Sequence, residues 1–150
     1  MRLCLYRPEI AGNVGAVMRL GACMGVAIDL IEPMGFDWDD KRVRRTAMDY
    51  IDHVDVTRHA SFDAFLETAG GARIILFTTK AVRSSYRFDY APDDILLFGM
   101  ESGGVPMEVA AHCAASVRIP IRAEVRSFNL ATSAALALGE ALRQTDGLPA

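Results

Sequence analysis

Five short apolar runs, separated by segments of helical pattern, most constrain what this chain can fold into. They are "LCLY" (3–6), "VAIDLIEP" (26–33), "RIILFTTK" (73–80), "ILLF" (95–98) and "VRIPI" (117–121). Several runs are apolar at successive positions rather than at alternate ones, which is typical of strands buried on both faces. Strands that alternate with helices predict a parallel sheet flanked by helices. We therefore expect a single α/β domain over residues 1–150, without repeats or linkers.

The segments between the apolar runs carry helix and turn signals. Helices are expected over residues 13–25, 38–50, 61–69, 106–114 and 129–143, a short strand over 53–57 and a surface loop over 81–93. Asn13 and Ser61 are expected to cap their helices, because their side chains can accept hydrogen bonds from the first free amides. Pro106 is expected at the first helical position, where a missing N–H does no harm.

Charge and cysteine content exclude several functional classes. The net charge of −3 gives no general attraction for nucleic acid, so RNA binding would need a local basic patch or a second subunit. Cys4, Cys23 and Cys113 form no CxxC pair, which predicts buried free thiols in a reducing compartment and no metal site. No signal peptide is apparent, and no run reaches the roughly 18 apolar residues of a membrane span. We expect a cytoplasmic protein.

The loop after the fourth apolar run, "GMESGGV" (99–105), contains three glycines and one carboxylate, Glu101. In open α/β sheets ligands bind beyond the carboxyl ends of the strands, and glycines allow a close approach to the backbone. The Gly-x-x-x-Gly-Gly spacing is not a dinucleotide fingerprint, and a P-loop would need a lysine. Tight turns alone would also account for the glycines, so the residues leave both explanations open.

Two further strand-end loops carry small or polar groups. "TTK" (78–80) ends the third run, and Arg126, Ser127 and Asn129 follow the fifth, directly before the last helix. Ser127 and Asn129 could instead be helix caps. Because three such loops occur late in the chain, we expect a site for a neutral or cationic ligand.

Three stretches, "PEIAGNVGAVMRLGA" (8–22), "LLFGMESGGVP" (96–106) and "VRIPIRAEVRSFNLATSAALALGEALRQ" (117–144), together resemble the SPOUT class of RNA methyltransferases. "IEPMGFDWDDKRVRRTAMDY" (31–50) and "TTK" narrow the resemblance to the tRNA 2′-O-methyltransferases of the wobble nucleotide, cytidine or modified uridine. The resemblance covers nearly the whole chain. It implies a SPOUT fold with a C-terminal trefoil knot, a homodimer, S-adenosylmethionine bound in the knot, and the anticodon region of tRNA as partner.

The same resemblance assigns a cofactor shell, much of it contacted through the backbone. Its members are Phe77, Thr78, Gly99, Met100, Glu101, Gly104, Ile119, Pro120, Ile121, Ser127, Asn129 and Leu130. Arg19 is the implied catalytic residue. A guanidinium with a pKa above ~12 is a poor base. We therefore expect Arg19 to grip a phosphate and the ribose oxygen and to stabilise developing negative charge; a solvated helix arginine is the alternative.

Basic and acidic side chains outside this shell have less defined roles. Lys41, Arg42, Arg44 and Arg45 form a dense basic patch, in which Arg42 and Arg45 share a helix face and could meet the anticodon stem. A solvated helix balanced by neighbouring aspartates is the alternative. Arg126 could pair with Glu101, bind RNA phosphate or lie free on the surface. Glu101 could cap the following helix or orient the amides of its own loop.

The sequence alone leaves three candidate functions. The first is 2′-O-methylation of the tRNA wobble ribose, and the second is methylation of another RNA site by the same chemistry. The third is a non-catalytic module that binds a nucleotide or RNA, which the joint presence of four residues disfavours, namely Arg19, Glu101, Ser127 and Asn129. Relatives usually carry a tyrosine where Gly139 precedes Glu140, so an aromatic contact at the dimer or RNA surface is lost here.

Overall fold

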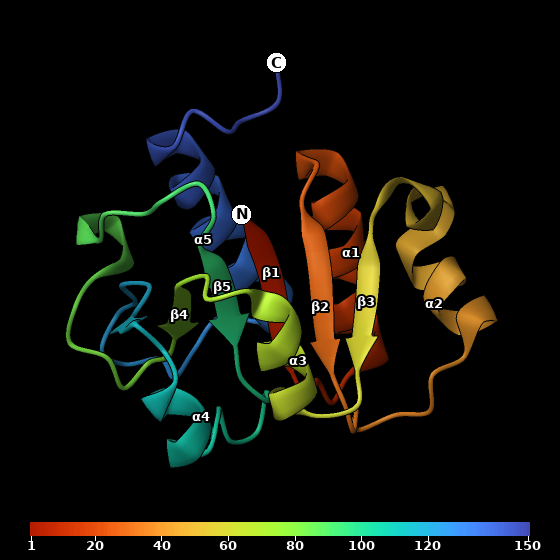
Figure 1. Ribbon diagram of the computed structural model, residues 1–150, viewed down its shortest axis with the longest axis horizontal. Helices are drawn as coiled ribbons and strands as arrows, with labels where there is room; N and C mark the ends of the chain where they lie inside the picture. The colour runs from red at the N-terminus through yellow and green to blue at the C-terminus, as the bar shows by residue number, and fades with distance from the viewer.

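The computed structural model describes residues 1–45 and 50–150 in full and, for residues 46–49, the secondary structure alone. Its strands are β1 (Arg2–Tyr6), β2 (Ala27–Ile31), β3 (Val56–His59), β4 (Ile74–Phe77), β5 (Ile95–Phe98) and β6 (Ala115–Val117). Its α-helices are α1 (Ala11–Met24), α2 (Asp40–Ala47), α3 (Phe62–Ala69), α4 (Met107–Ala111) and α5 (Leu130–Gln144), with 3-10 turns η1 (Met48–His53) and η2 (Ser85–Arg87). Figure 1 shows their arrangement.

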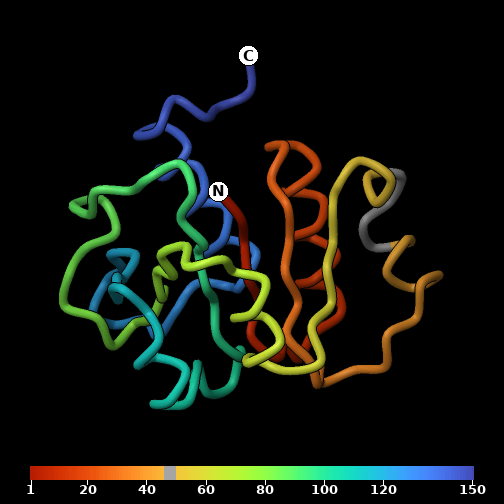
Figure 2. The backbone as a smooth tube through the Cα atoms, in the orientation of Figure 1, coloured from red at the N-terminus to blue at the C-terminus, as the bar shows by residue number. Residues whose placement is uncertain are grey.

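The strands form one six-stranded sheet in the order β3-β2-β1-β5-β4-β6, and each neighbouring pair is parallel. The predicted parallel α/β sheet is therefore confirmed. The strand order changes direction between β1 and β5, so the carboxyl ends of these two strands form the switch point where open α/β sheets bind ligands. The backbone trace runs from the N-terminus inside the sheet to the C-terminus beyond α5 (Figure 2).

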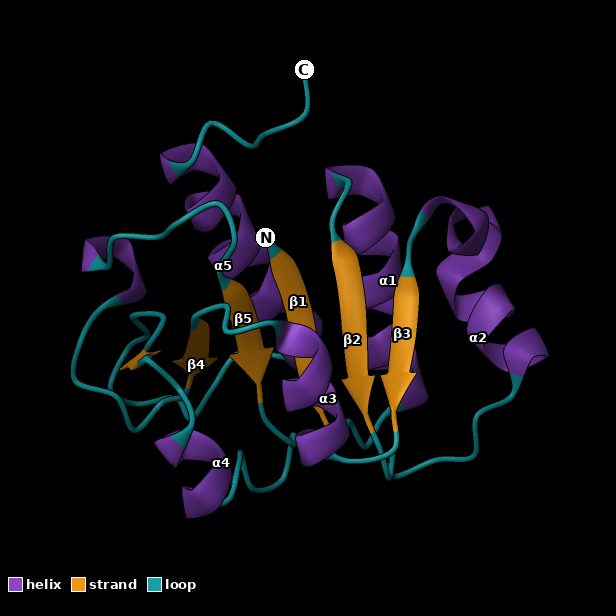
Figure 3. Cartoon of the chain, in the orientation of Figure 1, coloured by secondary structure: helices purple, strands orange, loops and turns teal.

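Apolar side chains cover both faces of the sheet. Alternate residues of β1 point to opposite faces: Leu3 and Leu5 join a cluster with α1 and α5, whereas Cys4 joins a second cluster with α3 and α4. The two layers of helices lie on opposite sides of the strands in Figure 3. This arrangement explains why the strand sequences are apolar at successive positions.

Several local predictions hold and others do not. Ser61 caps α3 as expected, since its hydroxyl accepts from the Ala64 amide at 3.1 Å. Asn13 does not cap α1, because Ile10 occupies the cap position and Asn13 lies buried in the first turn. Pro106 stands at the cap of α4 rather than at its first helical position.

The last strand is shorter than predicted. β6 ends at Val117, so Ile119 and Ile121 belong to the following loop. β3 begins at Val56, later than the predicted 53–57, and the helix expected over 38–50 is α2 followed by η1.

The three cysteines are unpaired, but they are not all buried. Cys4 is buried, Cys113 is half-buried and Cys23 is exposed on α1, so the expectation of buried thiols is wrong for Cys23. Burial raises the pKa of the Cys4 thiol well above its usual value and that of Cys113 to about 11. Among the residues described, no cluster of three or more histidine, cysteine or carboxylate side chains could hold a metal.

Candidate functional site

The glycine loop after β5 folds back tightly on itself. Met100 and Gly104 exchange two backbone hydrogen bonds of 2.9 Å. A Cβ on Gly99 would lie 2.4 Å from the carbonyl carbon of Gly104, and Gly104 itself has a φ of +67°. Both positions therefore require glycine for the turn alone. Gly103 is different, because the nearest atom to its added Cβ is a methionine methyl at 3.8 Å.

Two carboxylates join the glycine loop to the segment after β1. Glu101 Oε2 accepts from the Glu9 amide at 2.9 Å, while the Glu9 carboxylate accepts from the Ser102 amide at 2.8 Å and from the Ser102 hydroxyl at 2.6 Å. The hydrogen bonds from Ser102 hold the pKa of Glu9 below its usual value. Because β1 and β5 are neighbours, these loops meet at the switch point of the sheet.

A chain of amides continues from Glu101 to the last helix. Asn13 donates to Glu101 Oε1 at 3.1 Å, and Asn129 donates to Asn13 Oδ1 at 2.9 Å. Asn129 Oδ1 then caps α5 by accepting from the amides of Ala131 and Thr132 at 2.9 and 3.3 Å. Segments far apart in the chain are thus held together.

We call Glu9, Asn13, Glu101, Ser102 and Asn129 the carboxylate–amide network. It explains two corrections to the sequence-based expectations. Glu101 neither caps α4, whose cap position is Pro106 without a side-chain bond, nor bonds the amides of its own loop. Asn13 is no helix cap, because its amide bridges Glu101 and Asn129 instead.

The remaining strand ends lie next to this loop. β4 lies between β5 and β6, and the Thr78 amide donates to the Val117 carbonyl at 2.9 Å, which joins the ends of β4 and β6. Phe77 is buried, with its ring stacked on Phe98 at a centroid distance of 4.9 Å. The Phe77 side chain is therefore engaged in ring packing, and the expected contact of its backbone with a ligand stays a prediction.

The segment from 119 to 128 keeps most of its backbone polar groups available. Among the described residues, its one internal backbone hydrogen bond runs from Val125 N to Arg122 O at 3.3 Å. Ile119 and Ile121 are half-buried, and Leu130 at the start of α5 is buried. Half-buried apolar side chains beside unused backbone donors and acceptors suit a flat, neutral ligand.

Comparison with known proteins decides the family. The model of the SpoU rRNA Methylase family matches residues 1–139. The chain belongs to this family.

Individual relatives of this SpoU-family chain are similar to it in sequence over nearly their whole length. A protein named tRNA (cytidine(34)-2'-O)-methyltransferase from Beijerinckia indica is 49% identical over 150 residues, which is 97% of this chain and 92% of the relative. A solved structure described as giving insights into the 2-OH methylation of C/U34 on tRNA is 42% identical, with a TM-score of 0.90 over 95% of this chain and 94% of its own. The resemblance inferred from the motifs is confirmed.

A more distant structure of the same fold carries a cofactor. The AdoMet-bound rRNA methyltransferase from Sinorhizobium meliloti is 27% identical, with a TM-score of 0.86 over 95% of this chain. The match takes up 55% of that longer chain, so the SpoU-like domain is only part of that protein.

Arg19, the catalytic residue implied by the resemblance, lies apart from the network. Its side chain is on the exposed flank of α1, and its guanidinium carbon is 4.8 Å from the centroid of the Tyr50 ring. Asn13 is buried on another flank, and six residues of helix separate the two by a rise of about 9 Å. Arg19 and Asn13 therefore do not share a helix face.

The predicted RNA contacts are exposed. Arg42 and Arg45 both lie on the outer face of α2, while Val43 between them is buried. Arg126 and Ser127 are exposed in the loop before α5, and neither side chain has a hydrogen bond or ion pair within the described part of the chain. The suggested pairing of Arg126 with Glu101 is wrong, because that carboxylate is bound by Glu9 and Asn13.

Two residues of the network had no assigned role in the sequence, namely Glu9 and Ser102. Both belong to stretches that carry the family resemblance, but nothing in their spacing relates them, since they are 93 positions apart. The usable signal is the sheet order: once β1 is placed beside β5, the polar groups after these strands must meet.

Proposed function

We propose that this chain transfers a methyl group from S-adenosylmethionine to the ribose 2′-hydroxyl of the tRNA wobble nucleotide, cytidine 34 or modified uridine 34. The carboxylate–amide network carries the proposal, because it fixes the glycine loop against the start of α5. The chain is also 49% identical to a protein named tRNA (cytidine(34)-2'-O)-methyltransferase. The anticodon region of tRNA is the partner, with Arg42, Arg45 and Arg126 as exposed contacts for its phosphates.

The residues at the three strand ends fit the cofactor. Its adenosine is a flat group with donor and acceptor edges, which the unused backbone of 119–128 and the open side of Gly103 can meet. Met100, Ile119 and Ile121 offer half-buried apolar surface beside them. We therefore assign the cofactor to Thr78, Gly99, Met100, Gly104, Ile119, Ile121, Ser127 and Leu130, with Phe77 contacting it through its backbone and Glu101 and Asn129 fixing the loops.

S-adenosylmethionine, when bound, supplies an electrophilic methyl group on a sulfonium with a good leaving group. The tasks left to the protein are alignment of the attacking hydroxyl and stabilisation of the charge that develops as its proton leaves. Glu101 is occupied by two hydrogen bonds, so it positions the loop rather than taking that proton. Arg19 holds the ribose oxygen and a neighbouring phosphate.

The position of Arg19 supports a homodimer as the active form. The side chain is exposed on α1, and its guanidinium lies over the Tyr50 ring. Exposed apolar side chains at Ile10, Phe128 and Leu136 lie near the ends or along the outer faces of α1 and α5. A second copy packed on these helices would bring Arg19 to a cofactor loop.

Two expectations stay predictions. They are the C-terminal trefoil knot of the SPOUT class and the cytoplasmic location. Within its described part, no helix is long and apolar enough to cross a membrane.

The test is methyl transfer from methyl-labelled S-adenosylmethionine to unmodified tRNA, followed by digestion and identification of the labelled nucleoside. Label on a 2′-O-methylated pyrimidine at position 34 is the expected result. Label on another nucleotide would support the same methyl-transfer chemistry at a different RNA site. Absence of label, with tRNA binding retained, would favour a non-catalytic module. Arg19→Lys should lower kcat, because lysine cannot hold two oxygens in the bidentate manner of arginine.

A further inference from the structure

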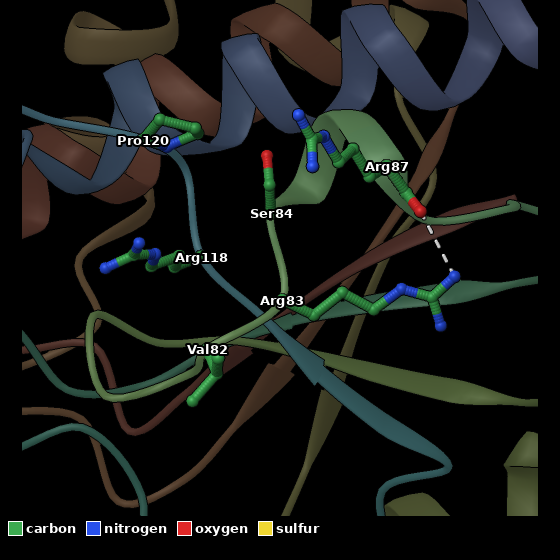
Figure 4. Close-up of a pocket in the computed structure, with 6 residues that line it drawn as sticks. All are labelled: Val82, Arg83, Ser84, Arg87, Arg118 and Pro120. Atoms are coloured by element: carbon green, nitrogen blue, oxygen red, sulfur yellow. Dashed lines mark hydrogen bonds between the residues drawn. The ribbon is translucent and has the colours of Figure 1, made fainter.

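A concave site lined by three arginines lies beside the strand-end loops and shares Pro120 with the cofactor shell that the resemblance implies. It is an open cavity of about 580 Å³ bounded by Val82, Arg83, Ser84, Arg87, Arg118 and Pro120 (Figure 4). No carboxylate is among these lining residues. The glycine loop and the network take no part in it.

The backbone that carries these arginines is firmly held. The Arg118 amide donates to the Arg83 carbonyl at 2.9 Å, and the Ser85 amide donates to the Arg118 carbonyl at 2.8 Å, so the turn pairs with the residue after β6. The buried Tyr90 hydroxyl donates to the Ser85 carbonyl at 3.0 Å. The cavity is therefore preorganised on bonded backbone rather than on a free loop.

The three arginines do different things. Arg83 extends away from Arg118 and donates to the Arg87 carbonyl at 3.1 Å, and Asp89 lies 3.8 Å from its guanidinium (Figure 4). Arg83 thus braces the turn. The guanidinium groups of Arg87 and Arg118 lie on either side of Ser84, both are exposed, and neither has a hydrogen bond or ion pair with any residue the structure describes.

Two unpaired guanidinium groups in a concave site create a positive potential in a chain whose net charge is −3. Arginine forks match the oxygens of a phosphate with charge-assisted hydrogen bonds. S-adenosylmethionine has no phosphate, and its single carboxylate is the only group of the cofactor that could compete for this place.

The cavity adjoins the proposed cofactor site. Arg118 follows Val117, whose carbonyl accepts from the Thr78 amide, and Pro120 stands between Ile119 and Ile121. An anion held by Arg87 and Arg118 would therefore lie next to the loop that holds the cofactor.

We propose that Arg87 and Arg118 bind a backbone phosphate of the substrate RNA close to the methylated nucleotide. This inference rests on the proposed function. It assigns the cavity a role in holding RNA in register, without reading bases, because guanidinium–phosphate contacts carry no sequence information.

The test compares Arg87→Gln, Arg118→Gln and the double variant with Arg143→Gln. The control removes the same charge from a guanidinium that Glu140 already holds through two hydrogen bonds of 2.9 Å. Each pocket variant should weaken tRNA binding about fivefold to tenfold and flatten the dependence of log K on log salt by roughly 0.7 to 1. The KM for tRNA should rise with kcat almost unchanged, and Arg143→Gln should match the wild type.

Two results would overturn the inference. One is a double variant that binds tRNA with unchanged affinity and salt dependence while the wild type methylates position 34, which leaves the proposed function standing. The other is weakened binding of S-adenosylmethionine alone, which would make its carboxylate the occupant. If the variants lose tRNA affinity but the wild type transfers no methyl group, the proposed function fails and the phosphate site remains. Arg87→Lys with Arg118→Lys should recover part of the affinity.

Discussion

The chain contains two polar clusters that differ in burial and in what they connect. Asp29 is completely buried in the sheet, where its Oδ1 lies 2.5 Å from an Arg2 guanidinium nitrogen and 2.7 Å from His59 Nε2. These three residues come from the adjacent strands β1, β2 and β3. The carboxylate–amide network, by contrast, lies at strand ends, is only partly buried and joins loops to the start of α5.

The difference shows how one fold separates stability from function. A buried carboxylate must be paired, and Arg2 and His59 supply the partners of Asp29 from the two neighbouring strands. The negative charge of Asp29 also contributes, after burial, to the raised pKa of Cys4, which lies opposite it in the sheet. The carboxylate–amide network leaves its loops accessible to a ligand and fixes only their positions.

Removing the buried carboxylate is expected to have the largest effect on stability. Asp29→Ala should lower the free energy of unfolding by roughly 3–5 kcal/mol, because it leaves Arg2 and His59 without their common partner. Urea unfolding measures the loss. Asp52→Ala is the matched control, since Asp52 is exposed and 3.6 Å from Arg44, and it should cost less than about 1 kcal/mol. Equal losses in the two variants would show that burial of the Asp29 cluster adds nothing to its contribution to stability.

Breaking the network should cost less stability than removing Asp29 and should also weaken ligand binding. Asn13→Ala should cost about 1–3 kcal/mol of stability, because Glu101 and Asn129 lose the amide between them. The dissociation constant of S-adenosylmethionine should rise about tenfold as the loops lose their fixed spacing. Calorimetric titration measures this, with urea unfolding in parallel.

The Asn129→Ala variant and the double variant complete the cycle. Asn129→Ala should cost about 1 kcal/mol for the helix cap in addition to the shared hydrogen bond. The sum of the stability losses of the two single variants should exceed the loss of the double variant, since both single variants remove the same hydrogen bond. Strict additivity would show that Asn13 and Asn129 act independently.

Much of this fold is predictable from local pattern, because the strands are apolar on both faces and Ser61 and Asn129 mark helix starts. β5 occupies the predicted residues 95–98. The strand after Cys113 was placed too late, since "VRIPI" is apolar enough for a strand but only its first residue pairs with β4. Propensity alone does not show where an edge strand stops pairing.

The site was less predictable because its contacts are distant in sequence. The resemblance named Glu101 and Asn129, and the strand-end rule placed the loops, but neither shows that Asn13 lies between them, 88 positions from one and 116 from the other. Asn13 was assigned as a cap on a local rule, and a long-range hydrogen bond uses the side chain instead. The Arg87–Arg118 cavity likewise depends on a pairing of the 83–85 turn with Arg118, the residue after β6, that no local signal reveals.

Gly139→Ala should stabilise α5 without changing the geometry of the site. A Cβ at this position meets nothing within 4 Å, and glycine inside a helix costs about 1 kcal/mol relative to alanine. The free energy of unfolding should therefore rise by about 1 kcal/mol, with the dissociation constant of S-adenosylmethionine unchanged. A loss of stability would mean that this face of α5 is covered closely by a second copy in solution.

The smallest expected effect is the dependence of the network on pH. Because Ser102 lowers the pKa of Glu9 below its usual 4.5 in the folded state, the ionised carboxylate contributes stability that is present above that usual value. The contribution is lost as the pH falls through the lowered pKa of the folded protein. The wild type and Glu9→Gln should therefore differ by a constant amount in urea midpoint between about pH 6 and 8 and converge below about pH 4.5. Glu67→Gln, at an exposed carboxyl of α3, controls for the loss of one negative charge. A difference that grew on acidification would have the wrong sign for a hydrogen-bonded carboxylate and would show that Glu9 is protonated when it binds Ser102.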